Sequence, residues 1–320
     1  MKVKERNSMA NYVFGVDVGG TTVKMGLFDK DGNVVEKWEI PTRTQNHGEN
    51  ILPDIAGSIQ EKMSEKGIAK DDVIGVGVGV PGPVDRDGIV HRAVNLGWAE
   101  LDLKKELTAL LGGMRVEGGN DANVAALGEM WKGGGQGHKN LVAVTLGTGV
   151  GGGIIINGKI MTGATGSGGE IGHIHVEDEE TEACGCGNHG CLEEYASATG
   201  ITRLANRKLQ ESDKDSVLRQ GKVSAKAVFD AVKEGDELAV EVAKKFGDYL
   251  GKGLAVIAGV VNPEIFVIGG GVSKAGDVLF DYIRPAFDKT VFHGCKDTQF
   301  ALATLGNDAG IYGAAKMVLD

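Results

Sequence analysis

The sequence contains few proline, cysteine and aromatic residues, and its basic residues do not outnumber its acidic ones. Only 6 of its 320 residues are proline, 4 are cysteine, and aromatic side chains make up 5%. Four cysteines, three of them close together, do not suit a disulfide framework, so a reducing, cytoplasmic location is expected. The net charge of −10 argues against binding of a nucleic-acid backbone, which calls for basic patches.

A long uninterrupted apolar run is also missing. The most apolar window, residues 253–272, is broken by Asn262, Pro263 and Glu264, so no membrane span is expected. Residues 1–11 are charged without an apolar centre, which predicts a disordered leader rather than a signal peptide. Hydrophobic residues still make up 42% of the chain, enough at this length for a sizeable core and two domains.

Glycine is abundant, with 52 residues gathered in short runs between apolar segments. Apolar patterning predicts strands at residues 12–18, 23–28, 34–40, 73–80, 114–117, 141–146, 153–156, 264–268 and 299–304. Helical spacing predicts helices at residues 51–66, 101–111, 122–131, 201–209, 226–233, 236–261, 276–292 and 308–318. This mixture predicts an α/β fold, and the glycine runs are typical of phosphate loops and tight strand turns.

Two of the predicted strand pairs are joined by turns rich in glycine and threonine. The first turn is Gly19, Gly20, Thr21 and Thr22, and the second turn is Gly147, Thr148 and Gly149. Backbone N–H groups and threonine hydroxyls in such turns can hold phosphate oxygens, and Asp17 before the first turn can hold Mg²⁺ through water. Either turn alone is also compatible with a plain tight hairpin. Their repetition about a domain's length apart indicates a duplicated unit that binds nucleotide phosphates from both sides.

Two further segments follow predicted strands. Asp121 lies between a strand end and a helix start, so it can be an N-cap or a catalytic base at the mouth of an open α/β sheet, and one residue can serve both roles. Gly269, Gly270 and Gly271 follow a later strand. There a ribose or a flat ring can lie against the backbone, or the chain simply turns into a helix.

Three cysteines fall within eight positions, and a histidine precedes the first of them by eleven residues. These four residues are His173, Cys184, Cys186 and Cys191. Thiolates and one imidazole at short spacing predict a tetrahedral zinc site. Glu170 and Glu193 flank the ligands, so zinc can hold a histidine and two carboxylates in fixed relation beside a polar pocket. The alternative is a zinc knot remote from any chemistry.

The motifs, in their order along the chain, resemble those of the ROK family of sugar kinases and sugar-responsive repressors. They read DVGGTTVKMGLF, GGNDANVAALGE, LGTGVGGG, GGEIGHIHV, CGCGNHGCLEEYAS and IGGG. Within the family, the chain is most similar to bacterial glucokinases of the Gram-positive type. The resemblance implies an actin-like ATPase fold, with two RNase H-like α/β domains around a cleft. It assigns a small domain to residues 1–118, completed by a C-terminal helix at about 305–320, and a large zinc-carrying domain to residues 119–304.

The resemblance also implies roles for individual residues. Asp121 matches the catalytic base, and the first and second turns match the two phosphate loops. Gly269 to Gly271 resemble the adenosine-side loop. The residues that match contacts to the sugar, or lie near positions that line its pocket, are Asn120, Glu170, His173, Glu193, Gly82 and Asn95. His173, Cys184, Cys186 and Cys191 match the zinc ligands, whereas His175 and His189 are rivals by proximity that do not fall on the family position.

The implied activity is transfer of the γ-phosphoryl group of ATP to O6 of glucose. Mg²⁺ bridges the phosphates near Asp17, and Asp121 accepts the hydroxyl proton. A structural zinc aims His173, whose second ring nitrogen meets the sugar, and fixes the Glu193 loop. The resemblance further implies a homodimer or homotetramer.

Several alternatives stay open at this point. The acceptor can be another hexose such as fructose or allose, or an N-acetylhexosamine such as N-acetylmannosamine or N-acetylglucosamine, and the donor can be polyphosphate. A non-catalytic sugar sensor is the alternative from another class. The repressors of the family carry an N-terminal helix-turn-helix domain. About ten residues before the first predicted strand, together with the acidic balance, disfavour DNA binding.

Overall fold

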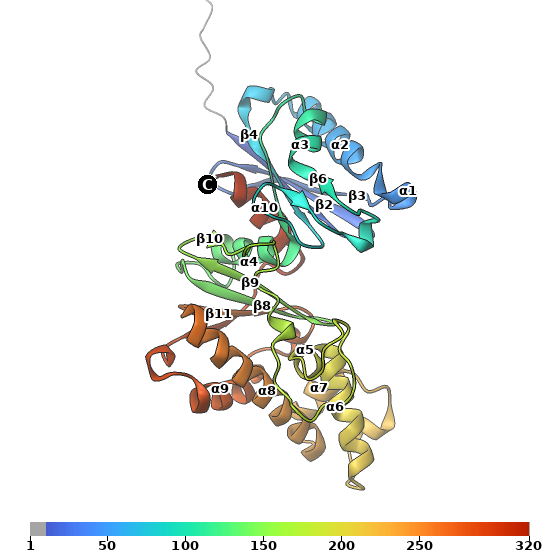
Figure 1. Cartoon of the computed structure of the whole chain (residues 1–320), viewed down its shortest axis with the longest axis vertical. Coiled ribbons are helices and arrows are strands. Elements are labelled where there is room, and N and C mark those ends of the chain that lie inside the picture. Colours follow the sequence, from blue (N-terminus) through green and yellow to red (C-terminus); the bar gives the residue numbers. More distant parts are fainter. Residues whose placement is uncertain (1–10, 320) are drawn as a thin grey trace, which may run out of the picture. The chain divides into compact units, whose positions relative to one another are not determined.

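The computed structural model describes residues 11–319, which form two compact units (Figure 1). The first unit contains the described residues up to 136 together with residues 159–168 and 307–319, and the second contains residues 137–158 and 169–306. The leader predicted over residues 1–11 lies, up to residue 10, outside the described part of the chain. Within residues 11–319, no helix is both long and apolar enough to cross a membrane.

The first unit is built on a five-stranded sheet in the order β3-β2-β1-β4-β7. Its strands are β1 (Tyr12–Val18), β2 (Thr22–Asp29), β3 (Val34–Pro41), β4 (Val73–Val80) and β7 (Val116–Asn120). β1, β2 and β3 pair antiparallel, whereas β4 runs parallel to β1 and to β7. Because β1, β4 and β7 run in one direction, Asp17, Val80 and Asn120 come to the same edge of the sheet.

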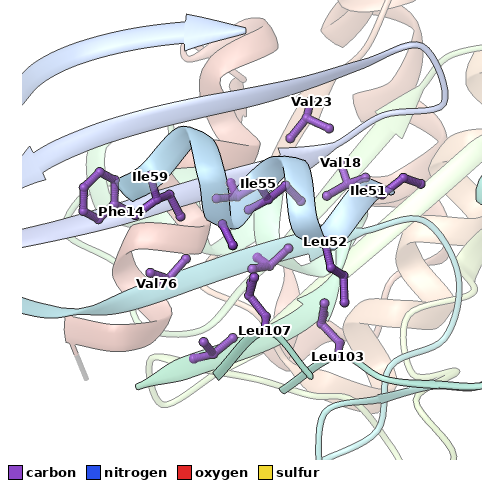
Figure 2. Close-up of a cluster of buried hydrophobic side chains, with 14 of the residues drawn as sticks. Phe14, Val18, Val23, Ile51, Leu52, Ile55, Ile59, Val76, Leu103 and Leu107 are labelled. Carbon is purple, nitrogen blue, oxygen red and sulfur yellow. The ribbon is translucent and has the colours of Figure 1, made fainter. Parts of the chain in front are cut away.

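Helices cover both faces of this sheet. On one face, α2 (Ile51–Lys66) and α3 (Leu103–Leu110) bury apolar side chains against Phe14 and Val76 (Figure 2). On the other face, Val13 and Phe28 meet α10 (Ala309–Leu319). Successive residues of a strand point to opposite faces, so β1 contributes to both layers. The remaining short elements of the unit are α1 (Gln45–Gly48), β5 (Ile89–Val90), β6 (Leu101–Asp102) and β10 (Lys159–Ile160).

The helix α4 (Asp121–Lys132) belongs to the first unit because it packs directly on α10. A Cβ atom on Gly313 of α10 would overlap the carbonyl oxygen of Val124 in α4, so only glycine permits this close approach. The domain division expected from the family resemblance, at about residue 118, assigns this helix to the second domain. The contacts of the structure group it with the first.

The second unit repeats the order of strands of the first. Its strands run β9-β8-β11-β12, as β2-β1-β4-β7 do, with one antiparallel pair followed by parallel neighbours. They are β8 (Leu141–Leu146), β9 (Val150–Ile156), β11 (Ile265–Gly269) and β12 (Gln299–Leu302). The helices are α5 (Glu193–Ala196), α6 (Ala198–Glu211), α7 (Ala225–Lys233), α8 (Glu237–Val261) and α9 (Val278–Thr290). This repetition is the duplicated unit predicted from the two turns.

The predicted strands and long helices are present, with shifts at their ends. The strand predicted at 114–117 is β7, residues 116–120, because its parallel pairing with β4 continues as far as Val80 opposite Asn120. The strand predicted to begin at residue 153 begins at Val150, since the glycines before it pair with β8. In both places glycine lowers the strand propensity of a segment that tertiary pairing then makes a strand.

Candidate functional site

Asn120 organises the start of α4. Its side-chain oxygen accepts hydrogen bonds from the backbone N–H groups of Ala122 (3.1 Å) and Asn123 (3.2 Å). Its amide nitrogen donates to the carbonyl oxygen of Gly82 at 3.1 Å. The helix cap predicted at Asp121 is therefore Asn120, and the same side chain ties the loop after β4 to the helix.

Asp121 is the first residue of α4, and its carboxylate is exposed. One carboxylate oxygen accepts a hydrogen bond from the N–H of Ala122 at 2.8 Å and another from the amide of Asn120 at 3.1 Å. The positive end of the helix dipole stabilises a negative charge at this position. The result is an accessible, oriented carboxylate at the carboxyl edge of the sheet, a geometry that suits a proton acceptor.

Gly82 and Asn95 lie in the long connection between β4 and β7. Gly82 has a φ of 103°, and a Cβ atom there would overlap the carbonyl oxygen of Arg92, so the position requires glycine. Asn95 is exposed in the short turn Val94–Leu96. Its Cβ would lie 3.8 Å from a Cβ placed on Gly20, which sets it beside the first turn.

The first turn is held by backbone and hydroxyl groups. The N–H of Gly19 donates to the carbonyl of Thr22 at 3.0 Å, and Thr42 beyond β3 donates its hydroxyl to the carbonyl of Gly19 at 2.7 Å. The N–H of Thr42 also donates to Thr21 at 2.9 Å. The sequence gives no signal for Thr42, because its contact depends on the pairing of β2 with β3.

Asp17 is the last residue but one of β1, two positions before the first turn, and its side chain is half-buried. Burial, and then the negative charge of Asp121, raise the pKa of Asp17 to about 6, while Lys24 lowers it. The two carboxylates therefore act on one another at one edge of the sheet. A pair of carboxylates with one raised pKa is an arrangement that a divalent cation stabilises.

The second turn has different partners. The N–H of Gly147 donates to Gly149 at 3.0 Å, and the N–H of Ala198, the first residue of α6, donates to the carbonyl of Gly147 at 2.8 Å. The N–H of Val150 donates to the Oε2 atom of Glu193 at 3.3 Å. Thr148 is exposed at the tip. The turn is thus supported from α5 and α6.

The glycine run after β11 faces a small cavity. The hydroxyl of Ser273 donates to the carbonyl of Gly270 at 2.8 Å, and the short helix Val272–Ala275 follows. The cavity, of about 130 Å³, is lined by Gly271, Val272, Lys274, Ala275 and the α7 residues Ala225, Lys226, Phe229 and Asp230. Gly269, at the end of β11, and Gly270 form the turn that leads into it.

The four predicted zinc ligands come together in the second unit. One ligand atom from each of them lies within 4.8 Å of all the others. These residues, called here the cysteine–histidine cluster, are His173, Cys184, Cys186 and Cys191. The Sγ atoms of Cys186 and Cys191 are 3.7 Å apart, and Cys184 Sγ lies 3.7 Å from His173 Nδ1.

These separations fit a tetrahedral zinc ion. Zinc–sulfur bonds of about 2.3 Å and zinc–nitrogen bonds of about 2.0–2.1 Å place ligand atoms about 3.6–3.8 Å apart at the tetrahedral angle. A disulfide would instead need a sulfur–sulfur distance of about 2.05 Å. In the protein alone, burial raises the pKa of the Cys184 thiol. A thiol that coordinates zinc is deprotonated, so a bound ion would offset the free-energy cost of ionising the buried Cys184.

The rival histidines have other partners. The ring of His175 contacts the carbonyl oxygen of His189 at 2.9 Å and the carboxylate of Asp178 at 2.8 Å. That hydrogen bond to Asp178 is the main reason the pKa of His175 is raised. His189 contributes its backbone to a short pairing with Ala183. Neither ring is part of the cysteine–histidine cluster.

The two predicted glutamates flank the cluster in sequence, and Glu193 contacts it. Glu193 begins α5, and its Oε1 atom is 3.1 Å from Cys184 Sγ and 3.8 Å from His173 Nδ1. Glu170 precedes the turn Ile171–His173, and its exposed side chain stands on the same turn as His173. Since Nδ1 of His173 faces the cluster, its Nε2 atom is the nitrogen left for another partner.

Comparison with known proteins identifies the family. The sequence matches the ROK family over residues 13–320. The glucokinase of Halalkalibacterium halodurans is 46% identical over 95% of this chain and 94% of that protein, and the glucokinase of Thermotoga maritima is 38% identical over 96% of each. The crystal structure of a ROK family glucokinase from Streptomyces griseus, in complex with glucose and AMPPNP, has a TM-score of 0.72 at 34% identity. That match covers 96% of this chain and 98% of that one. The chain therefore belongs to the ROK family, and the predicted actin-like ATPase fold is confirmed.

Proposed function

We propose that this protein is a glucokinase-type sugar kinase that transfers the γ-phosphoryl group of ATP to the 6-hydroxyl of glucose. The similar proteins named above are glucokinases, and one was crystallised with glucose and an ATP analogue. The observation in this structure that carries the proposal is Asp121. It is an exposed, hydrogen-bonded carboxylate at the first residue of α4, tied through Asn120 to the Gly82 loop.

Asp121 acts as the general base. It accepts the proton of the sugar hydroxyl as the phosphoryl group is transferred. Asn120 and the Gly82 loop line the sugar pocket on the first unit, with Asn95 nearby. Since phosphoryl transfer depends mainly on positioning and charge neutralisation, the cap geometry at Asn120 is the part of the unit that aims the base.

Each unit carries glycine-rich segments that suit nucleotide binding. The N–H and hydroxyl groups of the first and second turns bind phosphate oxygens. Asp17 would hold the Mg²⁺ that accompanies ATP, and the ion would neutralise the negative charges of Asp17 and Asp121. The turn at Gly269 to Gly271, beside its cavity, accommodates the adenosine.

The cysteine–histidine cluster would hold a structural Zn²⁺ through His173, Cys184, Cys186 and Cys191. When bound, the ion supplies fixed ligand geometry rather than chemistry at the phosphate. His173 then presents Nε2 to a sugar hydroxyl, and Glu170 and Glu193 present carboxylates that select the pattern of hydroxyls. A sugar that lacks one of these hydroxyls leaves a polar group unpaired and is bound more weakly.

The test is ADP release from MgATP by the purified protein, with glucose, mannose, fructose, N-acetylglucosamine and N-acetylmannosamine side by side. Strong turnover with glucose and little with the N-acetyl sugars is the expected result. Preference for an N-acetyl sugar would support the kinase activity and replace glucose as the proposed substrate. No turnover with any of these sugars, in protein shown to contain zinc, would refute the proposal.

A further inference from the structure

Glu193 connects the cysteine–histidine cluster to the second turn. Its two carboxylate oxygens have different partners within the second unit. Oε1 accepts the S–H of Cys184 at 3.1 Å, whereas Oε2 accepts the N–H of Val150 at 3.3 Å. The sequence separation between Val150 and Glu193 is 43 residues, so this link exists only through the fold. A metal-bound Cys184 is deprotonated and no longer donates, so an ion can hold Glu193 only through the backbone between the ligands.

The second turn is shaped around this carboxylate. A Cβ atom on Gly149 would overlap the Oε2 atom of Glu193, so glycine lets the turn close on it. A second connection joins the start of the second turn to the residues that follow Glu193. The N–H of Ala198 donates to the carbonyl of Gly147 at 2.8 Å, and the N–H of the preceding Ser197 donates to the carbonyl of Glu193 at 3.2 Å. The turn is therefore held at both ends by the segment that begins with Glu193.

That segment is fixed in turn by the cluster. Glu193 follows Cys191 by two residues, and the N–H of the intervening Leu192 donates to the carbonyl of Ile174 at 2.8 Å. Ile174 directly follows His173, so a ligand lies next to each end of this hydrogen bond. A bound ion that holds His173 and Cys191 together would keep Glu193 in one place.

We propose that Glu193 is a positioning residue through which metal occupancy of the cluster sets the affinity of the second turn for nucleotide, independently of any sugar. This rests on the proposed function, because it takes the second turn as a phosphate-binding loop. With the ion bound, the cluster keeps Oε2 against the N–H of Val150 and the turn stays in its binding shape. Without the ion, the carboxylate is free to turn to solvent and the turn loses that support.

The experiment measures MgADP affinity by titration calorimetry without sugar, on metal-loaded protein and on the same protein after a strong chelator. Stripping the metal should weaken MgADP binding by the wild type about tenfold, the size expected for one charge-assisted hydrogen bond. E193Q should be about tenfold weaker even with full zinc content, and stripping should weaken it no further. E194Q is the matched control. Glu194 is the next residue of α5, but its carboxylate accepts a hydrogen bond from Arg203 at 2.8 Å, so the response of E194Q should equal that of the wild type.

Two results would overturn the inference. One is equal MgADP affinity for zinc-loaded wild type and E193Q, which remains decisive even if the stripped protein unfolds. The other is a loss on stripping that is as large in E193Q as in the wild type. Either of these, with glucose-dependent ADP release by the zinc-loaded wild type intact, contradicts the coupling alone. Absence of MgADP binding by the zinc-loaded wild type would overturn the proposed function and the coupling together.

Discussion

The first and second turns are alike in sequence and differ in what supports them. Both follow the first strand of a hairpin and consist of glycine and threonine. The first turn is held by neutral groups, namely its own backbone and the hydroxyl of Thr42. The second turn is held by the charged side chain of Glu193. One carboxylate oxygen accepts the N–H of Val150, directly after the turn, and the other contacts Cys184 Sγ.

This difference shows how a duplicated unit can acquire a dependence that its counterpart lacks. The first turn draws its support from Thr42, directly after β3 of the same sheet, and the charged Asp17 precedes it by two residues. The second turn draws its support from Ala198 of α6 and from Glu193 of α5. α5 is a four-residue helix, too short to be stable without tertiary contacts. A metal site that fixes α5 therefore affects the second turn, while the first turn stays independent of it.

The largest effect is expected from D121N. The change keeps the size of the side chain and its place at the start of α4, but it removes the proton acceptor. Glucose-dependent ADP release should fall by about two to four orders of magnitude, the usual contribution of a general base, while calorimetry should show that glucose still binds. Near-native kcat in this variant would contradict the assignment of the base.

Removal of the metal is expected to have the next largest effect. It distinguishes the two turns, because only the second is expected to depend on the metal. C186S should lose zinc, and turnover should fall by about tenfold to a hundredfold or more. Losses of that size follow when even a residue that hydrogen-bonds to a metal ligand is mutated. Elemental analysis and ADP release on the same sample provide the check. Loss of zinc with unchanged kinetics would show that the cluster is a remote structural knot and that the two turns are equally independent of it.

D17N tests the charge beside the first turn. The pKa of Asp17 is raised to about 6 in the folded protein from its ordinary value of 3.8. Its favourable contribution to folding is therefore present below about pH 4 and lost as the pH rises through about 6. In the absence of Mg²⁺, D17N should raise the free energy of unfolding at pH 7.5 by up to about 2 kcal/mol, allowing for partial exposure.

Unfolding of both proteins across the pH range checks this prediction. The difference between D17N and the wild type should vanish near pH 4 and grow between pH 4 and pH 7. The variant should at the same time lose activity, because the carboxylate that costs stability is the one proposed to serve Mg²⁺. A difference that does not change with pH would mean that Asp17 has an ordinary pKa.

T42V is expected to have the smallest effect. It removes the hydroxyl that donates to Gly19 and keeps the shape of the side chain. Since the carbonyl freed at this exposed turn can bind water, the cost is about 1 kcal/mol or less and the KM for MgATP should rise only a few-fold. Zinc content should stay unchanged. Loss of zinc from T42V would be at odds with the independence of the first turn.

Local chemistry made the cysteine–histidine cluster and the hairpins predictable from the sequence. The spacing of Cys184, Cys186 and Cys191 limits them to one short loop, and the structure brings them together with His173. The family pattern, rather than proximity, separated His173 from His175, whose ring contacts Asp178 and the backbone of His189. The hairpins followed from apolar strands on either side of glycine turns.

Contacts between distant segments were not predictable. Asn120 and Asp121 are both good helix caps, and only the position of the Gly82 loop makes Asn120 the cap. The placement of α4 depends on its approach to Gly313, which nothing in either segment indicates. The hydrogen bond from Val150 to Glu193 likewise depends on how the fold brings the start of α5 to the start of β9, so the proposed dependence of the second turn on the cluster emerged only from the structure.

The most direct test of the proposed activity is to identify its product. Metal-loaded protein would be incubated with MgATP and glucose, and a phosphorus–proton correlation spectrum would locate the new phosphoester. The account predicts a phosphate coupled to the two protons on C6, formed in step with ADP. A phosphate on another carbon, or release of inorganic phosphate with glucose unchanged, would contradict it.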